Sequence, residues 1–318
     1  MFDDATMPKA SPIHFRLDKG GNYALVQATI FGQVRAALGG TPCSEGFARR
    51  SDAFNFSLFI GTQADALMSH GVADKNYLLR SAKGRPLLHN FRHVFVPGRW
   101  SAERLQRSPG LDFRGGIHVV GWPRLDALIA MQNAVPQKDV GGRPKVLWAP
   151  THDLGGFGGK GEGMSSFPAF ERHLEALGEI AEVTVSLHPR NRRDKKPTQE
   201  KLVECDILIS DTGTMVYEAW ALGKPVIFPR WLLEDRVEQA LMPETAERHI
   251  FDERIGLHPR SFDELADMVH ARPALDQRTR DFLYSYLDPA LLGRSSARIA
   301  DLLRSLSCPG GAPKLTVA

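Results

Sequence analysis

The sequence predicts an α/β protein of two domains, each built on a mainly parallel β-sheet. Three observations predict this class. The chain has 318 residues, enough for about two domains of roughly 150 residues each. Hydrophobic residues make up 42% of the chain and charged residues 24%, as in globular proteins with buried cores. Along most of the chain, short apolar runs alternate with amphipathic segments, which is typical of strand–helix–strand units.

The first domain is predicted at residues 1–135. A short strand at residues 13–17 precedes a helix at residues 23–38, because Val26, Ile30, Val34 and Leu38 recur there at helical spacing. The remaining elements are strands at residues 56–60, 93–96 and 117–120 and a helix at residues 124–133.

The second domain is predicted at residues 145–318, after a linker at residues 136–144 that contains Pro136, Gly141 and Gly142 and has no hydrophobic period. The alternation in this half predicts a doubly wound parallel sheet. Gly223 stands where a helix ends, and Ser261 with Glu264 indicates the start of another helix. The strands are expected at residues 145–149, 183–187, 207–209 and 225–228, and the helices at residues 167–177, 199–203, 214–222, 261–270 and 295–306.

Charge and cysteine content narrow the classes of partner and compartment. Lys and Arg number 40 against 37 Asp and Glu, a net charge of +3, which is too small for a dedicated nucleic-acid-binding protein. The three cysteines, Cys43, Cys205 and Cys308, form no CxxC pair, so we expect a reducing compartment. The chain has neither an apolar run long enough to span a membrane nor a signal peptide at its start. We therefore expect a cytoplasmic protein.

The strongest local motif is a strand, a small polar turn, a helix and a second strand at residues 205–228. The turn contains Ser210, Asp211, Thr212 and Gly213 and ends at Thr214. Ligands of open α/β sheets bind at the carboxyl ends of the strands, and the free amides of a helix N-terminus favour phosphate there. The turn therefore predicts a phosphate site. The alternative is that its polar side chains only cap the helix.

A second motif, Leu187-His188-Pro189-Arg190, ends the preceding strand and should emerge at the same edge of the sheet. His188 is suited to contact a phosphoryl oxygen. The basic run at residues 190–196 predicts attraction of an anionic acceptor or of lipid headgroups, although such a run is more often a solvated loop.

In the first half, His70 stands beside Gly71 and five residues before Lys75, after a short apolar stretch. Histidine is the side chain best suited to accept a proton near neutral pH, so His70 is a candidate base. The alternative is a histidine held by a backbone carbonyl beside a solvated lysine.

Two further patterns are weaker. Thr151 leads into a glycine-rich loop at residues 155–163, but Leu154 and Gly161 replace residues that a Walker motif requires, so a loop over the cleft or an inert surface loop is expected. His89 and His93 are spaced like a metal pair but have no carboxylate or cysteine nearby. We therefore predict no metal site.

Taken in order, these fragments resemble the CDP-glycerol glycerophosphotransferase family, whose members extend teichoic acids and related glycerol-phosphate polymers. The resemblance runs from His70 to Ile299, and the first sixty residues match no family that we can place. It is carried by His70-Gly71 with Lys75, His188-Pro189 and residues 120–126, 146–151, 206–218 and 293–299. The resemblance implies a GT-B-like α/β fold with two Rossmann-like domains facing a central cleft.

The resemblance also implies roles for residues. His70 falls on the catalytic base and His188 on a second essential histidine near the pyrophosphate. Gly213 and Thr214 occupy the place of a serine pair that binds donor phosphates, and Glu218 replaces an aspartate on the same helix. The predicted donor-binding residues are Lys75, Thr151, Arg190, Ser210, Asp211, Thr212, Gly213, Thr214 and Glu218.

The function implied is transfer of glycerol phosphate, or a related polyol phosphate, from a CDP-alcohol to a hydroxyl of an anionic glycan or lipid-linked acceptor, with release of CMP. The expected partners are the donor, this acceptor and the inner face of the cell membrane, with no nucleic acid. No cofactor besides the donor substrate is predicted, and the need for a divalent metal stays open. Two alternatives remain: a GT-B sugar enzyme such as a UDP-N-acetylglucosamine 2-epimerase or a nucleotide-sugar glycosyltransferase, and a non-catalytic nucleotide-binding module.

Overall fold

The computed structural model describes residues 10–19, 24–74, 76–135, 142–151, 163–188, 198–233 and 236–308. The chain forms two compact units, each with its own parallel sheet. The first unit comprises Met1–His70, Tyr77–Asp126 and Leu287–Ala318, and the second comprises Gly71–Asn76 and Ala127–Tyr286. The predicted α/β class is confirmed.

The first unit contains a six-stranded sheet in the order β2-β1-β3-β4-β7-β8. Every neighbouring pair in it is parallel. All residues of β1, β3 and β4 are buried. The polar side chains among them, His14, Arg16 and Asn55, form hydrogen bonds, as buried polar groups require. The edge strand β2 has the polar sequence Cys-Ser-Glu-Gly and escaped prediction. The strands are β1 (Ile13–Arg16), β2 (Cys43–Gly46), β3 (Phe54–Ser57), β4 (Ala66–Met68), β7 (His93–Val96) and β8 (Gly116–Val119).

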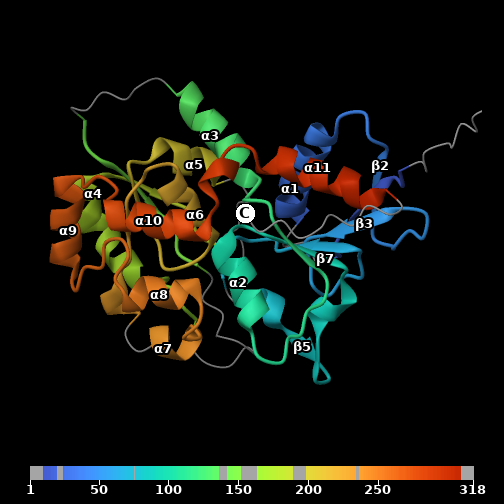
Figure 1. Cartoon of the computed structure of the whole chain (residues 1–318). Helices are drawn as coiled ribbons and strands as arrows, with labels where there is room; N and C mark the ends of the chain where they lie inside the picture. The colour runs from blue at the N-terminus through green and yellow to red at the C-terminus, as the bar shows by residue number, and fades with distance from the viewer. Residues whose placement is uncertain are drawn as a thin grey trace, which may run out of the picture. The chain divides into compact units, whose positions relative to one another are not determined.

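Two helices distant in the sequence lie side by side on this unit, α1 (Ala24–Leu38) and α11 (Ser295–Ser307) (Figure 1). The helix α1 buries Ile30, Val34 and Leu38 of the predicted stripe, together with Gln27 and Phe31. The connection from β4 to β7 contains the 3₁₀ helices η2 (Tyr77–Leu79) and η3 (Leu87–Asn90) and the hairpin of β5 (Ser81–Ala82) and β6 (Arg85–Pro86). The remaining helices that begin in this unit are α2 (Arg99–Arg107), α3 (Arg124–Ala134) and η6 (Pro289–Leu291).

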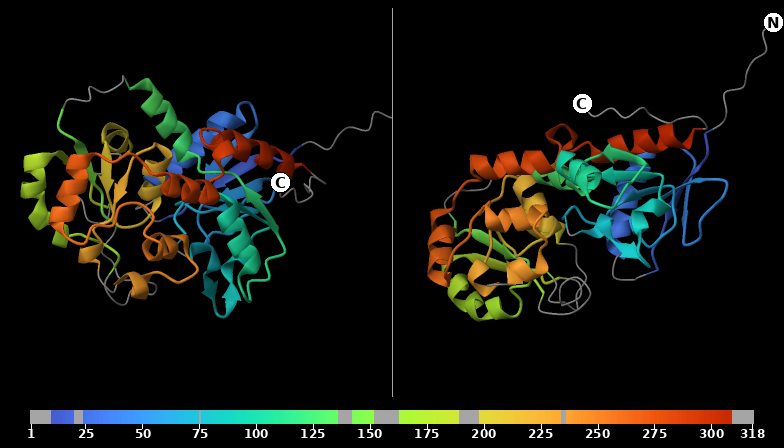
Figure 2. Two further views of the ribbon diagram at one scale, coloured as in Figure 1. Left: turned by 60° about the vertical axis from the view of Figure 1, so that its left-hand side comes forward. Right: turned by 60° about the horizontal axis from the view of Figure 1, so that its bottom comes forward.

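The second unit contains a four-stranded parallel sheet in the order β10-β9-β11-β12. The strands are β9 (Lys145–Trp148), β10 (Glu182–Val185), β11 (Ile207–Ile209) and β12 (Val226–Ile227). Helices lie on both faces of this sheet (Figure 2). The helices that begin in this unit are η4 (Ala169–His173), α4 (Leu174–Ile180), α5 (Gln199–Glu204), α6 (Thr214–Ala221), η5 (Arg230–Leu232), α7 (Arg236–Ala240), α8 (Ala246–Asp252), α9 (Phe262–Ala271) and α10 (Gln277–Tyr286).

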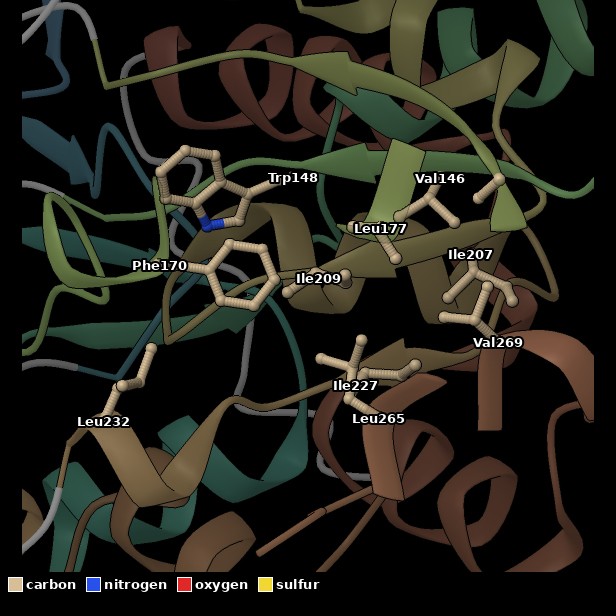
Figure 3. Close-up of a cluster of buried hydrophobic side chains, with 11 residues drawn as sticks. Val146, Trp148, Phe170, Leu177, Ile207, Ile209, Ile227, Leu232, Leu265 and Val269 are labelled. Carbon is tan, nitrogen blue, oxygen red and sulfur yellow. The ribbon is translucent and has the colours of Figure 1, made fainter. Parts of the chain in front are cut away.

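One face of the second sheet carries the core shown in Figure 3. Val146, Ile207 and Ile227 project from neighbouring strands and pack against Leu177 of α4 and Val269 of α9. Fully burying an aliphatic side chain of this size contributes roughly 2 kcal/mol. This cluster therefore holds the strands in place, and with them the polar turns at the carboxyl ends of β9 and β11.

Two elements begin at other residues in the structure than the sequence predicts. The helix expected at residues 167–177 begins as a 3₁₀ turn at Ala169 and continues as α4 to Ile180. Phe167 precedes Pro168, and the proline ring disfavours a helical backbone at the residue before it. The strand expected at residues 56–60 is β3, which pairs with β1 from Phe54 to Ser57.

The division into units differs from the predicted domains, 1–135 and 145–318, in three places. Residues 127–135, predicted in the first domain, belong to the second unit. The C-terminal helix α11 belongs to the first unit because it packs along α1. Residues 71–76 belong to the second unit although both flanking segments belong to the first. The predicted linker at residues 136–144 lies largely outside the described residues.

Candidate functional site

The polar turn after β11 is tied to the end of β9. Ser210 Oγ donates a hydrogen bond to the carbonyl of Ala149 at 2.7 Å. Asp211 is completely buried, and its Oδ2 accepts a hydrogen bond from the backbone N–H of Thr151 at 3.0 Å. Burial raises the pKa of Asp211 to about 6, and the neighbouring Ser166 and Arg236 act in the opposite direction. Ser210 and Asp211 thus hold two strand ends together.

The helix α6 begins at Thr214 without a side-chain cap. Its N-cap residue is Gly213, with φ of +111°, and no side chain there accepts a hydrogen bond from the first turn. Thr212 is buried, and its hydroxyl has no hydrogen-bond partner among the described residues. The first amides of a helix carry a partial positive charge and need acceptors. Within the described residues, the turn therefore offers helix-start amides without a side-chain acceptor and a buried hydroxyl without a partner. None of its side chains acts as the helix cap that was the alternative.

A short segment from much earlier in the sequence contacts the start of this helix. We call residues 71–76 the strap. The backbone N–H of Val72 donates a hydrogen bond to Thr214 Oγ1 at 3.1 Å. A Cβ atom on Gly71 would lie 2.9 Å from the same oxygen, so only glycine permits this approach without displacement. The hydroxyl of Tyr286 donates to the carbonyl of Val72 at 2.6 Å. Both backbone groups of Val72 are therefore satisfied within the second unit.

The other end of the strap is held by carboxylates. The backbone N–H of Asp74 donates to Glu247 Oε1 at 2.9 Å, and the carboxylate of Asp74 accepts from the N–H of Ala246, where α8 begins, at 3.1 Å. Tyr217 donates its hydroxyl to the same Glu247 oxygen at 3.1 Å. Burial and the charge of Glu247 raise the pKa of Tyr217 well above its ordinary value. No local sequence pattern marks Asp74, Tyr217, Glu247 or Tyr286, because their roles arise only from contacts between distant segments.

The segment that follows the glycine-rich loop is fastened beside the turn. Arg236 donates to the carbonyls of Gly163 and Ser165, each at 3.2 Å. Ser165 Oγ in turn donates to the carbonyl of Thr151 at 2.8 Å, and Thr151 is buried. Arg236 thus brings a cation near the strand ends, and no sequence pattern pointed to it.

The remaining predicted site residues lie in both units. His70 belongs to the first unit, where its ring stacks on Phe59 with centroids 4.9 Å apart and meets the edge of Tyr77 at 5.0 Å. His188 is half-buried, three residues beyond the end of β10. Glu218 is fully buried on α6. Lys75, Arg190 and most of the glycine-rich loop lie outside the described residues.

The described residues contain no group of three or more His, Cys, Asp or Glu side chains that could hold a metal ion. His89 and His93 have different partners: the ring of His89 meets the carbonyl of Leu111, and that of His93 meets His118 at 3.2 Å. Within the same residues, no helix combines the length and the apolar character that crossing a membrane requires.

Comparisons with known proteins support the resemblance seen in the sequence. The chain is 29% identical over 217 residues to the teichoic acid ribitol-phosphate polymerase TarK of Staphylococcus aureus (strain NCTC 8325 / PS 47), a match covering 58% of this chain and 40% of TarK. It is 28% identical over 211 residues to TarL of the same strain, covering 56% of this chain and 35% of TarL. The chain is thus similar in sequence to two teichoic acid polymerases over a little more than half of its length. The matches span less than half the length of these curated relatives, and no family model matches the chain.

Solved structures of a teichoic acid polymerase share the fold of this chain. The wall teichoic acid polymerase TagF superposes with a TM-score of 0.62 at 15% identity, covering 94% of this chain and 90% of the TagF chain. A TagF variant soaked with CDPG gives a TM-score of 0.60 at 14% identity, covering 94% of this chain and 89% of that one. The predicted GT-B-like architecture is thereby confirmed. The roles assigned to individual residues stay predictions.

Proposed function

We propose that this relative of the teichoic acid polymerases transfers a polyol phosphate from a CDP-alcohol to a hydroxyl of an anionic glycan or lipid-linked acceptor. The observation that carries the proposal is the uncapped start of α6, where Gly213 exposes the first amides and the buried Thr212 hydroxyl has no partner among the described residues. A phosphate group of the donor would satisfy both. The names of TarK, TarL and TagF supply the class of reaction.

The reaction is a displacement at phosphorus. The acceptor oxygen forms a bond to the β-phosphorus of the donor, while the bond from that phosphorus to the bridging oxygen breaks and CMP leaves. His70 takes the proton of the acceptor hydroxyl. His188 and the amides of α6 stabilise the negative charge that develops on the phosphate oxygens. No covalent enzyme intermediate and no cofactor besides the donor substrate is needed, and magnesium bound to the donor phosphates is compatible with the scheme.

Thr214 would have two partners in this scheme. Its oxygen already accepts a hydrogen bond from Val72, so its own proton is available to donate to a phosphate oxygen. The same hydroxyl would then join the strap to the donor. Lys75, Arg190 and Thr151 would add contacts, and Glu218, which is fully buried, would act by supporting α6 from within. We further propose that the enzyme works at the cytoplasmic face of the cell membrane.

Donor binding is tested by thermal-shift titration with CDP-glycerol, CDP-ribitol, CMP, UMP and UDP-N-acetylglucosamine. A ligand present at 100 times its Kd stabilises the folded state by about 2.7 kcal/mol. We expect stabilisation by a CDP-alcohol and CMP, about tenfold weaker binding for Thr212→Val because a hydrogen bond to a charged group is lost, and near-normal binding for Thr212→Ser. Stabilisation by the uridine compounds alone would support the sugar-enzyme alternative instead.

Catalysis is tested by measuring CMP release. We expect His70→Ala to bind the CDP-alcohol normally but to release CMP at least about a hundredfold more slowly, as for loss of a general base. Donor binding without any acceptor-dependent CMP release in the parent protein would favour the non-catalytic nucleotide-binding module.

A further inference from the structure

One stretch of the first unit forms a continuous layer on its sheet. Residues 77–114, which we call the basic layer, include η2, the β5–β6 hairpin, η3, β7 and α2. Their apolar side chains converge on one cluster with Leu67 of β4. Figure 1 labels β5, β7 and α2 of this layer, which are coloured from blue-green to green because they are close in the sequence. The layer contributes Leu88, Phe91, Val94, Val96, Leu105 and Leu111 to the cluster.

This layer carries a concentrated positive charge. It contains eight Lys or Arg residues and two acidic residues, a net charge of +6, whereas the whole chain has +3. The rest of the chain is therefore net negative. The only acids of the layer, Glu103 and Asp112, already pair with arginines of the layer: Glu103 with Arg99 and Arg107, and Asp112 with Arg114.

The hairpin presents three cations that have no such partner. Arg80, Lys83 and Arg85 are exposed, and none forms an ion pair within the described part of the chain. Lys83 and Gly84 form the two-residue turn between β5 and β6, with φ of +52° and +74°. Positive φ at both turn positions gives the tight turn that suits a hairpin. The three cations are thus held on a defined protrusion, where their mutual repulsion favours an anionic partner.

The chemistry of the layer favours a dissolved polyanion over a membrane. Surfaces that insert at a membrane interface combine cations with exposed Leu, Phe or Trp side chains. The large hydrophobic residues exposed on the described part of the chain are Leu25, Phe47, Val135, Val185, Met242 and Tyr284, and all lie outside residues 77–114. The apolar residues of the layer pack inward instead.

We propose that the basic layer binds the phosphodiester backbone of the anionic acceptor polymer, with the hairpin cations as its principal contacts. This inference rests on the proposed function, which supplies a polyol-phosphate acceptor. Arginine recognises phosphate with two parallel hydrogen bonds, and a flexible chain with regularly spaced phosphates contacts several cations at once. The layer thus retains the polymer between transfers, while the acceptor hydroxyl reacts elsewhere.

The test compares two triple variants for binding to poly(glycerol phosphate) freed of lipid, with fluorescence anisotropy as the readout and no nucleotide present. The hairpin variant is Arg80→Gln, Lys83→Asn and Arg85→Gln. The matched control is Arg254→Asn, Arg260→Gln and Arg278→Gln in the second unit. It removes the same charge from exposed positions and likewise replaces one residue with positive φ.

We expect the hairpin variant to bind the polymer about tenfold more weakly at low salt. The slope of its plot of log affinity against log salt concentration should be smaller by about 2, since each of the three lost phosphate contacts contributes about 0.7 to that slope. The control variant should retain the binding of the parent. Equal weakening in both variants would overturn the proposal in favour of overall charge. Equally hairpin-dependent binding of duplex DNA would overturn the choice of polymer.

Two further arms separate this inference from others. If the hairpin variant lost binding to phosphatidylglycerol vesicles but kept binding to the polymer, the layer would be a membrane surface and the proposal would be wrong. CMP release with a short soluble acceptor should be equal in parent and variant, since the hairpin takes no part in the transfer. If the parent neither binds a CDP-alcohol nor releases CMP, the proposed function fails, while hairpin-dependent polymer binding is still read independently.

Discussion

The backbone N–H of Val72 donates a hydrogen bond to the hydroxyl of Thr214, 142 residues later in the chain. The contact places the strap against the first residue of α6, where the proposed donor phosphates bind. Gly71, beside Val72, is bonded to His70, the proposed base. A backbone N–H of the strap thus donates a hydrogen bond to the hydroxyl that is proposed to bind the donor.

Gly71→Ala should break this relationship. The new Cβ would lie 2.9 Å from Thr214 Oγ1, so the hydroxyl must turn away from Val72. We expect a loss of about 1 kcal/mol in the free energy of unfolding, measured by urea denaturation, together with weaker binding of the CDP-alcohol. In a Thr214→Ala background the same substitution should cost much less, because the clash and the hydrogen bond are already gone. Equal costs in both backgrounds would contradict this explanation.

Tyr286→Phe should destabilise the protein by leaving the carbonyl of Val72 without its donor. Tyr286 is 1% exposed, and a buried polar group left unpaired costs about 1–3 kcal/mol. Tyr284→Phe is the control: Tyr284 is on the same helix but 45% exposed, so its change should stay within about 0.5 kcal/mol. Urea denaturation of both variants measures the difference, and two equal values would argue against the role of Tyr286.

Asp126→Ala should weaken the attachment of the C-terminal helix. The carboxylate accepts hydrogen bonds from the backbone N–H groups of Ser295 and Ser296, at 3.0 and 2.7 Å, where α11 begins. Loss of such a cap costs about 0.5–2 kcal/mol. Asp301→Ala removes an exposed carboxylate from the same helix and should have little effect. Faster hydrogen exchange in the first turn of α11 of the Asp126 variant alone would locate the effect.

Asp211→Asn should change the pH dependence of stability. Burial raises the pKa of Asp211 from 3.8 to about 6. A raised folded-state pKa favours folding below pH 4, and this contribution is lost as the pH rises through 6. The shift corresponds to about 3 kcal/mol, and Asn removes the charge without removing the oxygen that accepts from Thr151. The difference in unfolding free energy between parent and variant should therefore shift in favour of the variant between pH 4 and 7. A difference independent of pH would show that Asp211 does not titrate in this range.

Local patterns predicted much of the fold. The helix from Ala24 to Leu38, the strand from Ile207 to Ile209 and the helix from Thr214 lie where their hydrophobic periods placed them. The hydrophobic period of an element reflects which of its side chains are buried, so it can be read from residues that are adjacent in the sequence. The helix α2 was missed because only Leu105 of its nine residues is buried.

The candidate site was only partly predictable. The turn from Ser210 to Thr214 stood out because a small polar turn between a buried strand and a helix is a local pattern. Glu247, Tyr286 and Arg236 did not stand out, since each acts on a backbone group of a segment far away in the sequence. The sequence fragments around Gly121 and Ser295 were recognised separately. The structure shows that they meet, because a Cβ on Gly121 would clash with Ser295 Oγ.

The sequence by itself determined the α/β class, the parallel alternation of the second half, the polar turn from Ser210 to Thr214 and the resemblance to the polymerase family. Only the tertiary structure decided that the last helix joins the first unit and that residues 71–76 join the second. Hydrophobic period and turn chemistry are properties of adjacent residues. The unit to which a segment belongs depends instead on its hydrogen bonds and packing with distant residues. Examples are the hydrogen bonds between Asp126 and Ser296 and between Val72 and Thr214. No local sequence pattern predicts such contacts.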